Sequence, residues 1–560
     1  MTDAPHPLSP RGRELALEAM VREPLDLLVV GGGITGAGVA RDAALRGMKV
    51  ALVEQGDFGQ GTSSRSSKII HGGVRYLEYL QLGLVRESAR ERSILRRIAP
   101  HLVHHLTFLY PVFGGQSLLK IRAGLRLFDF LAGRHRGSWS RRLGPEETRE
   151  LLPGLRDPLK GAVRYPEYIT DDARFTLANV ASAAAHGAQV ANRARVDELV
   201  RSGERVVGAR IRDLEGDREI QVRARATVNA TGPSVQRLVE DSGLQIPEPV
   251  IASKGIHILL PRERLPLKAA TFIRSPSGKS GLAMPRGPWV YVGTTDTEYR
   301  GDLDRPRATP RDVDELLALV RDCFPEAGIG PDDVACTWAG LRPLVYEEGK
   351  STRDMSREDR VWTGPPGLVT VAGGKLTTYR PMARRILTAV ARTLGEPLPG
   401  TETTHLAPLP GAPEEDLQEF RGRTGRHLLR AGVSPEAVER LAFLYGTELE
   451  TLLEYGKEDP HWLSPLAEGV PALRGEVRLA VEREMALSLE DILDRRTAIL
   501  LFQPGGGASA APEAARIAGE LLGWSPERIR REIQAYQDLV REHGPRGITG
   551  SEPTAASRIR

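Results

Sequence analysis

The sequence predicts an α/β fold in which a parallel-sheet domain is interrupted by an antiparallel sheet and followed by an α-helical domain. A strand, a glycine-rich turn, a helix and a second strand occupy residues 26–54. Residues 250–260 and 281–295 alternate like antiparallel strands. Segments with helical periodicity occur at residues 414–431, 434–455, 474–501 and 512–543. A chain of 560 residues is also too long for one hydrophobic core.

The first element is a complete βαβ unit. Residues 27–30 form an apolar run suited to a buried parallel strand, and Gly31, Gly33 and Gly36 occupy the G-x-G-x-x-G positions. These glycines permit a tight turn, close approach of the backbone to a pyrophosphate, and close packing of helix on strand. Glu54 ends the second strand, where a carboxylate can accept hydrogen bonds from a ribose. The unit predicts a Rossmann-like domain that binds a dinucleotide.

The segment after this unit indicates which class of dinucleotide is bound. Many nicotinamide enzymes continue with another βα unit, whereas this chain has a loop rich in glycine and hydroxyl residues at positions 55–68. Amides and hydroxyls at this density can surround phosphate and the edge of a flavin. A polar surface loop is the alternative, and the preceding fingerprint disfavours it. We expect cofactor contacts from Thr62, Ser63, Ser64, Ser67 and Lys68.

Six further motifs occur in one order along the chain. They are Ser63-Ser64, Ser66-Ser67-Lys68, His71-Gly72-Gly73-x-Arg75-Tyr76, Gly293-Thr294-Thr295-Asp296, Gly340-Leu341-Arg342-Pro343 and Gly373-Gly374-Lys375-Leu376-Thr377-Thr378-Tyr379-Arg380. Together they resemble the FAD-dependent glycerol-3-phosphate dehydrogenases, the respiratory enzymes that reduce quinone. Residues 484–497 resemble the C-terminal helical domain of that family. The resemblance therefore spans roughly residues 25–540.

The order of the elements and the resemblance together predict a discontinuous FAD-binding domain of the D-amino-acid-oxidase type. We assign to it residues 24–99, 167–250 and 345–396, and to an inserted antiparallel sheet domain, which faces substrate and membrane, residues 100–166 and 251–344. Residues 1–23 are an N-terminal extension, 397–413 a linker, 414–545 the helical C-terminal domain and 546–560 a flexible tail. Returning segments should add cofactor contacts from Ala230, Gly232, Gly374, Lys375, Leu376 and Thr377.

Composition excludes several classes of protein. The net charge of +4 is small for this length and does not indicate nucleic-acid binding. Two cysteines, Cys323 and Cys336, leave no disulfide framework and no metal site, and both lie far from the dinucleotide motifs, so the FAD should be bound non-covalently. No apolar run approaches the roughly 18–20 residues that span a bilayer. The N-terminus lacks the apolar region of a secretory signal, so we expect a cytoplasmic protein.

Residues 117–142 form a basic amphipathic segment. Seven basic side chains stand there against one acid, Asp129, and they alternate with leucine, phenylalanine and tryptophan. Such a segment could lie in the interface of an anionic membrane, or it could be a partly buried helix with a solvated basic face. The resemblance implies peripheral attachment to the inner face of the cell membrane. A homodimer is one alternative for the oligomeric state.

Oxidation of glycerol 3-phosphate by a flavin needs cations for the phosphate, a base for the C2 hydroxyl, and positive charge near flavin N1 and O2. Arginine is the best geometric match for phosphate, and Arg342 and Arg353 match the positions of the family's phosphate-binding arginines. Arg75 and Tyr76 are weaker candidates for contact with the substrate.

The base should be a histidine, because an imidazole accepts protons near neutral pH. His71 ranks ahead of His257, because the two glycines after His71 suggest tight placement of the backbone beside the flavin. Lys375 follows two glycines and could supply the charge near N1 and O2 or touch the phosphate; the alternative is a lysine that caps the next helix.

The sequence therefore predicts oxidation of sn-glycerol 3-phosphate to dihydroxyacetone phosphate by hydride transfer to FAD, with electrons passed to membrane quinone. A glycerol-3-phosphate oxidase that uses dioxygen is the nearest alternative. A non-redox FAD-binding protein, such as one that modifies RNA, is a third reading. The aromatic content of 5% and the two unplaced cysteines argue against it.

Overall fold

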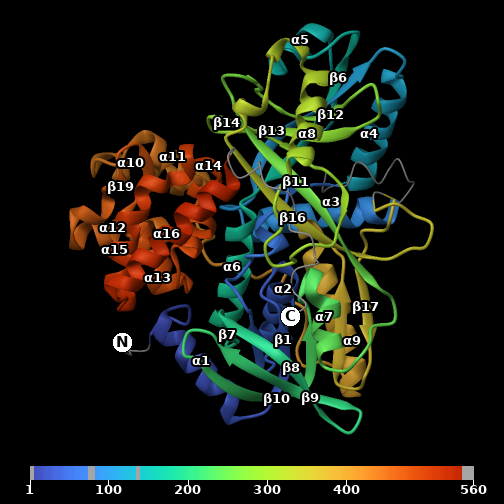
Figure 1. Ribbon diagram of the computed structural model, residues 1–560. Coiled ribbons are helices and arrows are strands. Elements are labelled where there is room, and N and C mark those ends of the chain that lie inside the picture. Colours follow the sequence, from blue (N-terminus) through green and yellow to red (C-terminus); the bar gives the residue numbers. More distant parts are fainter. Residues whose placement is uncertain (1–4, 73–81, 134–138, 353, 545–560) are drawn as a thin grey trace.

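The computed structural model describes residues 5–72, 82–133, 139–352 and 354–544. Figure 1 shows a parallel sheet with its helices at the bottom, a second sheet at the top, and the C-terminal helices on one side. The three predicted kinds of structure are therefore present.

The lower sheet is the predicted Rossmann-like sheet. Its main path joins β17 (Arg360–Thr363), β18 (Leu368–Ala372), β10 (Arg218–Asn229), β1 (Leu25–Val30), β2 (Val50–Val53) and β7 (Gln189–Ala191). Neighbours on this path are parallel, except that β17 is antiparallel to β18. Because β1, β10 and β18 come from three distant parts of the chain, the domain is discontinuous, as predicted. The strand β2 is buried throughout, as expected of a strand covered on both faces.

Two layers cover this sheet. On one face, α2 (Ile34–Leu45) packs beside α6 (Asp172–Ala185) and α9 (Tyr379–Leu394). On the other face lie α1 (Pro10–Arg22), α7 (Val235–Asp241) and the strands β8 (Ala194–Ser202) and β9 (Arg205–Asp213). The helix α1 begins with Pro10 after an N-cap serine, whose side chain accepts a hydrogen bond from the amide of Gly12.

The upper sheet is mostly antiparallel, as predicted, but it is a mixed sheet. Its path joins β15 (Thr297–Tyr299), β11 (Val250–Pro261), β14 (Trp289–Gly293), β13 (Ser280–Arg286), β12 (Ala270–Arg274), β4 (His104–Phe113), β6 (Leu159–Ile169) and β3 (Ile69–Ile70). In addition, β16 (Cys336–Val345) pairs with β11, and β5 (Arg141–Leu143) pairs with β6. The strands β12 and β4 pair in parallel. They belong to separate insertions, so no hairpin sets their relative direction.

Helices flank the upper sheet. The helix α8 (Pro310–Cys323) packs its apolar face on β11, β12 and β14, and α5 (Pro145–Leu151) lies beside β5 and β6. The helix α4 (Leu118–Ala132) packs against β6 and against α3 (Leu82–Ile98). No helix in the described part of the chain has the length and apolar character to cross a membrane.

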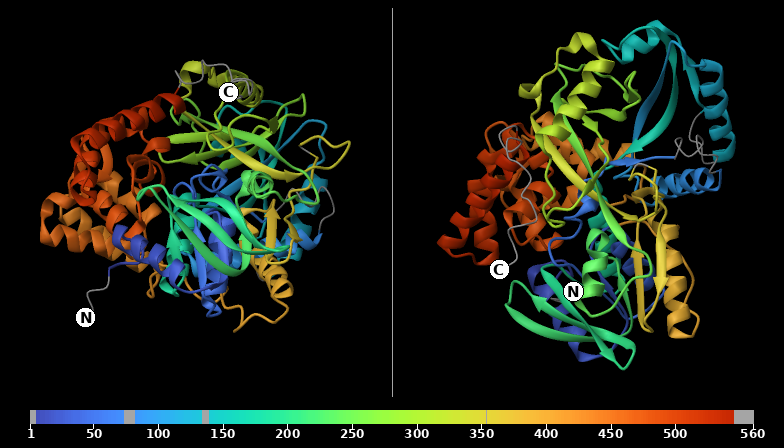
Figure 2. Two further views of the ribbon diagram at one scale, coloured as in Figure 1. Left: turned by 60° about the horizontal axis from the view of Figure 1, so that its bottom comes forward. Right: turned by 45° about the vertical axis from the view of Figure 1, so that its right-hand side comes forward.

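The C-terminal region is helical, but its helices are shorter than the periodicity indicates. They are α10 (Leu417–Arg430), α11 (Pro435–Leu444), α12 (Glu448–Glu458), α13 (Arg474–Glu484), α14 (Ile499–Phe502), α15 (Ala511–Leu522) and α16 (Pro526–His543). A π-helical turn, Asp491–Arg496, lies between α13 and α14. Left-handed residues such as Met485 (φ 53°) and Gly523 (φ 65°) break helices that the apolar period alone would continue. Figure 2 shows this region beside both sheets.

Candidate active site

A cavity of about 1750 Å³ is lined by residues of both sheets. It is lined by the carboxyl ends of β1, β10 and β18 and by the loops that follow these strands, with lining residues drawn from 30–35, 230–234 and 371–377. Residues of β4, β6, β11, β12, β13, β14 and β16 also line the cavity, and the C-terminal region adds Glu490, Leu539, Glu542 and His543. Ligands of open α/β sheets bind at the carboxyl ends of the parallel strands. The cavity is therefore the candidate active site.

The glycines of the first βα turn are required by close packing. Gly31 has a φ of 107°, and a Cβ there would lie 2.5 Å from the carbonyl oxygen of Ala230. A Cβ on Gly36 would lie 1.9 Å from the carbonyl oxygen of Gly31. Gly33 caps α2 and lines the cavity, whereas Gly36 does not, which agrees with a role for Gly36 in packing helix on strand. The N-terminus of α2 thus lies at the cavity, where the positive end of the helix dipole favours an anionic ligand.

Glu54 lines the cavity at the end of β2. Its carboxylate accepts hydrogen bonds from the amides of Gly32 (2.7 Å) and Gly56 (2.8 Å). Burial raises its pKa above the ordinary value. A carboxylate has about four acceptor positions, so two remain for a ribose. Glu54 therefore shapes the glycine turn as well as being placed for the predicted ribose contact.

Residues 55–68, which we call the hydroxyl loop, pass along the cavity. Thr62, Ser63 and Ser67 line it. The Ser63 hydroxyl accepts a hydrogen bond from the amide of Ile34 (2.9 Å), at the start of α2. The Thr62 hydroxyl donates to the carbonyl of Leu341 (2.5 Å) in the upper sheet. The loop therefore connects the two sheets at the point where the cofactor is expected.

Two of the predicted cofactor contacts in this loop are not part of the cavity lining. Lys68, in a left-handed conformation (φ 56°), is buried, forms an ion pair with Asp172 and donates to the carbonyl of Ser64 (3.1 Å). The Ser64 hydroxyl points back to the carbonyls of Gln60 and Gly61. Lys68 and Ser64 thus shape the hydroxyl loop from its far side, because a buried ammonium needs a carboxylate partner.

His71 and Lys375 lie together in the cavity lining. The amide of His71 donates to the hydroxyl of Thr377 (3.2 Å). Burial and the charges of Lys375, Arg92 and Arg357 lower the pKa of His71 to about 4. Burial and the charge of Arg357 lower the pKa of Lys375 to about 8. A neutral imidazole therefore lies in a cationic part of the site at pH 7.

His257 lies on β11 and is held more tightly. Its Nε2 lies 2.8 Å from the Ser67 hydroxyl, and its ring stacks on Trp338 with centroids 4.8 Å apart. A Cβ on Gly293 would lie 2.1 Å from its ring, so only glycine leaves room for it. Burial and the charges of Arg342 and Lys68 lower the pKa of His257 to about 3.

Arg342 lies inside β16. Its Nη2 donates to the hydroxyl of Thr294 (2.8 Å), and both Nη atoms approach the carbonyl of Thr295 at 3.3 Å. A Cβ on Gly255 would lie 2.2 Å from Nη2. The neighbouring glycine therefore makes the space in which the guanidinium reaches the cavity.

Sequence reasoning did not select Arg357, which lines the same cavity. Its guanidinium lies 2.6 Å from the carboxylate of Asp296, which is also 4.0 Å from that of Arg342. Although burial would raise the pKa of Asp296, Arg342, Ser253 and Arg357 lower it. Three arginines in residues 353–360 were the available signal, but their spacing does not say which one reaches the cavity.

Comparison with known proteins identifies the family. The model for "FAD dependent oxidoreductase" matches residues 26–380, and that for "C-terminal domain of alpha-glycerophosphate oxidase" matches residues 402–529. The aerobic glycerol-3-phosphate dehydrogenase of Bacillus subtilis is 38% identical, over 96% of this chain and 98% of that protein. The chain belongs to the FAD-dependent glycerol-3-phosphate dehydrogenase family.

Two further members extend the comparison. The glycerol-3-phosphate dehydrogenase of Mycobacterium leprae is 39% identical, over 95% of this chain and 91% of that protein. The solved glycerol-3-phosphate dehydrogenase of Bacillus halodurans, in complex with FAD, is 34% identical, with a TM-score of 0.80 over 96% of this chain and 98% of that one. This family member is therefore an FAD-dependent glycerol-3-phosphate dehydrogenase.

The residues present fit FAD. A Cβ on Gly33 would lie 3.0 Å from the Ser63 hydroxyl, so the glycine leaves the space that a pyrophosphate needs beside α2. The remaining predicted cofactor residues also line the cavity: Ala230, Gly232, Gly374, Lys375, Leu376 and Thr377. Cys323 and Cys336 are buried outside this lining.

Three predicted substrate residues, Arg75, Tyr76 and Arg353, fall outside the described residues. Their roles in this family member stay predictions.

Proposed function

We propose that this dehydrogenase oxidises sn-glycerol 3-phosphate to dihydroxyacetone phosphate and passes the electrons to membrane quinone. The observation that carries the proposal is that Arg342, Lys375 and His71 line the same cavity as the dinucleotide motifs. Oxidation of a phosphorylated alcohol requires cations for the phosphate and a group that accepts the hydroxyl proton. Bound FAD supplies the redox chemistry by accepting the hydride.

In this proposal Arg342 binds the phosphate. Thr294 and the carbonyl of Thr295 orient its guanidinium, so less side-chain freedom is lost when a phosphate binds. Arg357 and Lys375 add positive charge, and Asp296 balances part of it. Arg353 stays a proposed additional contact.

His71 is the proposed base for the C2 hydroxyl proton. Its lowered pKa, about 4, keeps the imidazole neutral and able to accept a proton at pH 7. The negative charge of a bound phosphate would oppose the cations that lower this pKa and would raise it towards the working pH. His257 is the alternative base, but its Nε2 already lies at hydrogen-bond distance from Ser67.

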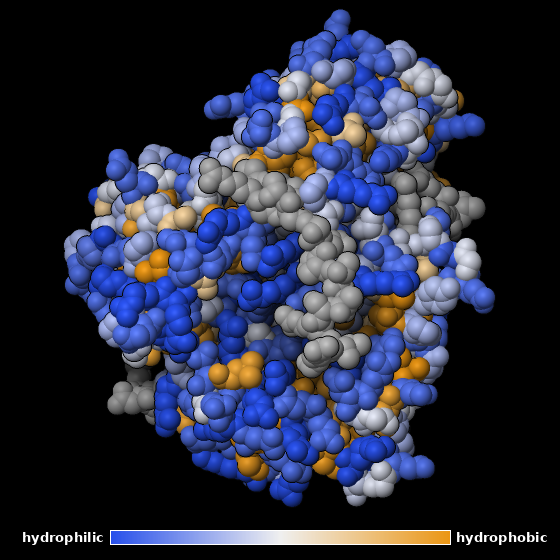
Figure 3. Space-filling view, in the orientation of Figure 1, coloured by the Kyte–Doolittle hydropathy of each residue, from blue (hydrophilic) through white to orange (hydrophobic). Residues whose placement is uncertain are grey.

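Attachment to an anionic membrane is proposed through α4 and the residues that follow it. Most of the surface in Figure 3 is hydrophilic, whereas Leu119, Phe130 and Trp139 are 75%, 72% and 51% exposed. Arg122 and Arg126 on α4 are also exposed. Exposed apolar side chains beside arginines are what an interfacial helix requires.

Quinone is favoured over dioxygen as the acceptor by two features. Membrane docking brings the enzyme to the quinone, and the cavity wall on the upper sheet carries Phe108, Tyr110 and Phe272, whose rings suit a flat apolar acceptor. Dioxygen needs neither feature.

A homodimer also stays a prediction, which light scattering of the purified enzyme would check.

The experiment that tests the function is anaerobic reduction followed by reoxidation. Glycerol 3-phosphate should bleach the flavin absorbance, and a soluble quinone should restore it much faster than air does. Failure of glycerol 3-phosphate to reduce the flavin would contradict the substrate. Faster reoxidation by air than by quinone would assign the oxidase reaction instead.

A further inference from the structure

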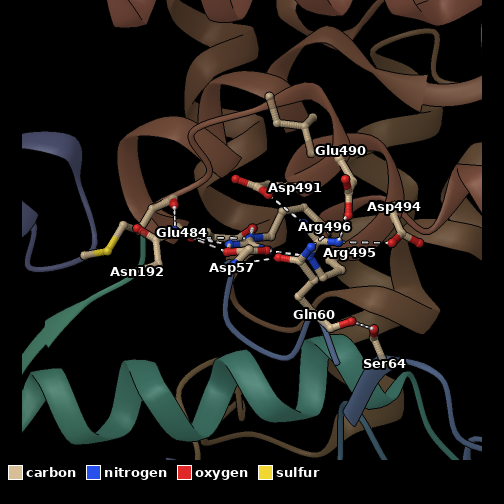
Figure 4. Close-up of polar contacts among 12 residues, drawn as sticks. Asp57, Gln60, Ser64, Asn192, Glu484, Glu490, Asp491, Asp494, Arg495 and Arg496 are labelled. Atoms are coloured by element: carbon tan, nitrogen blue, oxygen red, sulfur yellow. Dashed lines mark hydrogen bonds and ion pairs between the residues drawn. The ribbon is translucent and has the colours of Figure 1, made fainter. Parts of the chain in front are cut away.

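A buried network of charged side chains joins the C-terminal region to the hydroxyl loop. Figure 4 shows Arg495 and Arg496 converging on Asp57, with acidic residues around them. The two arginines belong to the π-helical turn Asp491–Arg496, which we call the clamp turn. None of Asp57, Asp494, Arg495 and Arg496 lines the cavity. Arg65, Arg193 and Glu490, which also belong to this network, do line it. The centre of the network around Asp57 therefore lies behind the cofactor cavity, and its edge reaches the cavity wall.

The first anchor is at the start of the hydroxyl loop. The carboxylate of Asp57 accepts hydrogen bonds from Arg495 Nε (2.6 Å) and from Arg496 Nη1 (2.7 Å) and Nη2 (2.8 Å). The three side chains are at most 1% exposed. Although burial would raise the pKa of Asp57, Arg496 and Arg495 lower it below its usual range. The carboxylate is therefore ionised and bound to the clamp turn by two charged partners.

The second anchor is nearer the end of the loop. The guanidinium of Arg65 forms a two-pronged contact with Asp494, at 3.1 and 2.6 Å. Asp494 also accepts from Arg495 Nη1 (3.2 Å). The clamp turn thus holds residues 57 and 65 of the loop at the same time, and Arg495 connects the two anchors.

The charged side chains around the clamp turn are paired with groups of opposite charge. Asp491 accepts from Arg495 Nη2 (2.6 Å) and from Arg193 (2.6 Å). Glu490 accepts from Arg495 Nη1 (2.9 Å). Because each buried charge has a partner, moving one anchor would leave another charge unpaired, which is strongly unfavourable.

The residues between the anchors meet the cofactor site. Ser63 accepts from the amide of Ile34 at the start of α2, and Thr62 donates to the carbonyl of Leu341. Thr62 and Ser63 both line the cavity. The position of the residues between Asp57 and Arg65 decides whether the loop and the start of α2 face the same ligand. The two anchors therefore control the shape of the FAD site.

We propose that Asp494, Arg495 and Arg496 are positioning residues for FAD: the clamp turn holds the hydroxyl loop in the shape that binds the cofactor. These three residues thereby act on FAD affinity from outside the cavity lining. This effect on FAD affinity differs from an effect on the overall stability of the protein, because it depends on the two contacts that hold the hydroxyl loop, at Asp57 and at Arg65.

The test is the FAD affinity of the apoprotein, measured by titration with flavin fluorescence as the signal. The variants are Asp494→Asn and Asp57→Asn, which keep the side-chain shape and remove the charge. We expect each to raise the Kd for FAD by about tenfold or more, the effect of one lost charge-assisted contact. Asp494→Glu, which keeps the charge, should recover most of the affinity.

The matched control is Arg478→Met on α13. Arg478 is 20% exposed, pairs with Glu458 and Glu482, and stacks on Tyr455, all in the C-terminal region. Its loss should lower the melting temperature of the apoprotein and leave the Kd unchanged. Hydrogen exchange should speed up at amides 57–67 in Asp494→Asn but not in Arg478→Met.

Two outcomes would overturn the proposal: an unchanged Kd in Asp494→Asn and Asp57→Asn, or an equal rise in Kd in Arg478→Met. If neither neutral variant folds, the Kd for FAD of Arg496→Lys tests the proposal instead, and we expect it to rise. It keeps the charge and loses the two-pronged geometry on Asp57. Normal FAD affinity in Arg496→Lys would also count against the clamp.

Discussion

The guanidinium of Arg357 lies 2.6 Å from the carboxylate of Asp296, in the wall that also carries Arg342. One carboxylate thus faces two arginines and keeps both guanidinium groups at the same part of the cavity. This relationship gives the proposed phosphate site two cations that can be tested separately.

Arg342→Ala and Arg357→Ala should each lower kcat/KM for glycerol 3-phosphate by about ten- to a hundredfold, with FAD retained. A charge-assisted contact in a partly buried site contributes about 1.5–3 kcal/mol. Steady-state kinetics with a dye acceptor and the flavin spectrum give the two readouts. Arg300→Ala is the control, because Arg300 is 86% exposed and pairs only with Glu298 among the ion pairs of the described residues. Wild-type kcat/KM in either cavity variant would remove that arginine from the site.

His71→Asn should slow anaerobic flavin reduction by roughly a hundredfold, because a positioned base contributes about 10²–10⁴ to the rate. Stopped-flow absorbance at saturating substrate measures this step directly. His257→Asn should slow it less. The opposite order would assign the base to His257.

The pH dependence of kcat/KM should differ from that of an ordinary histidine. Lowering the pKa of His71 to about 4 favours its neutral form, so the base is available at every pH above about 4. Lys375, with a pKa of about 8, loses its charge as the pH rises through 8. Apart from the ionisation of the substrate phosphate itself, whose second pKa is about 6, the profile should be flat between these values and fall on the alkaline side. An acid limb near 6.5 that is present in the parent enzyme and lost in His71→Asn would show that the free enzyme holds this base in an exposed setting.

FAD binding should depend on the backbone at Gly31. Gly31→Ala places a Cβ 2.5 Å from a carbonyl oxygen at a φ of 107°, so the turn must open. The purified variant should contain little flavin, as absorbance at 450 nm would measure.

Acid precipitation of the parent enzyme should release its FAD into the supernatant. Flavin retained on the pellet would contradict non-covalent binding.

Membrane binding should depend on both the charge and the apolar side chains of α4. Arg122→Glu with Arg126→Glu should weaken co-sedimentation with anionic liposomes, because each basic residue near the surface contributes about 1 kcal/mol. Phe130→Ser should weaken the part of the liposome binding that persists at high salt, because that part comes from apolar side chains. Dye-linked activity should stay intact.

The charge-matched control is Arg530→Glu with Arg531→Glu, a pair of exposed arginines on α16. Equal loss of binding in both double variants would show that net charge alone is responsible.

The sequence by itself determined the βαβ unit, the family and the identity of the cofactor. These depend on local features, because the glycines of residues 31–36 and the carboxylate at position 54 all lie within the one βαβ unit of residues 26–54. The alternating strands and the order of the motifs likewise predicted the discontinuous domain.

Only the tertiary structure decided which side chains of a motif face the cavity. Lys68 and Ser67 are neighbours, yet Lys68 pairs with Asp172 on the far side and Ser67 meets His257. The same limit applies to the parallel pairing of β12 with β4 and to the clamp on Asp57, whose partner Arg496 is 439 positions away in the chain. Local patterns specify elements, but contacts between distant segments depend on how those elements pack, and that packing is not encoded in any one stretch of sequence.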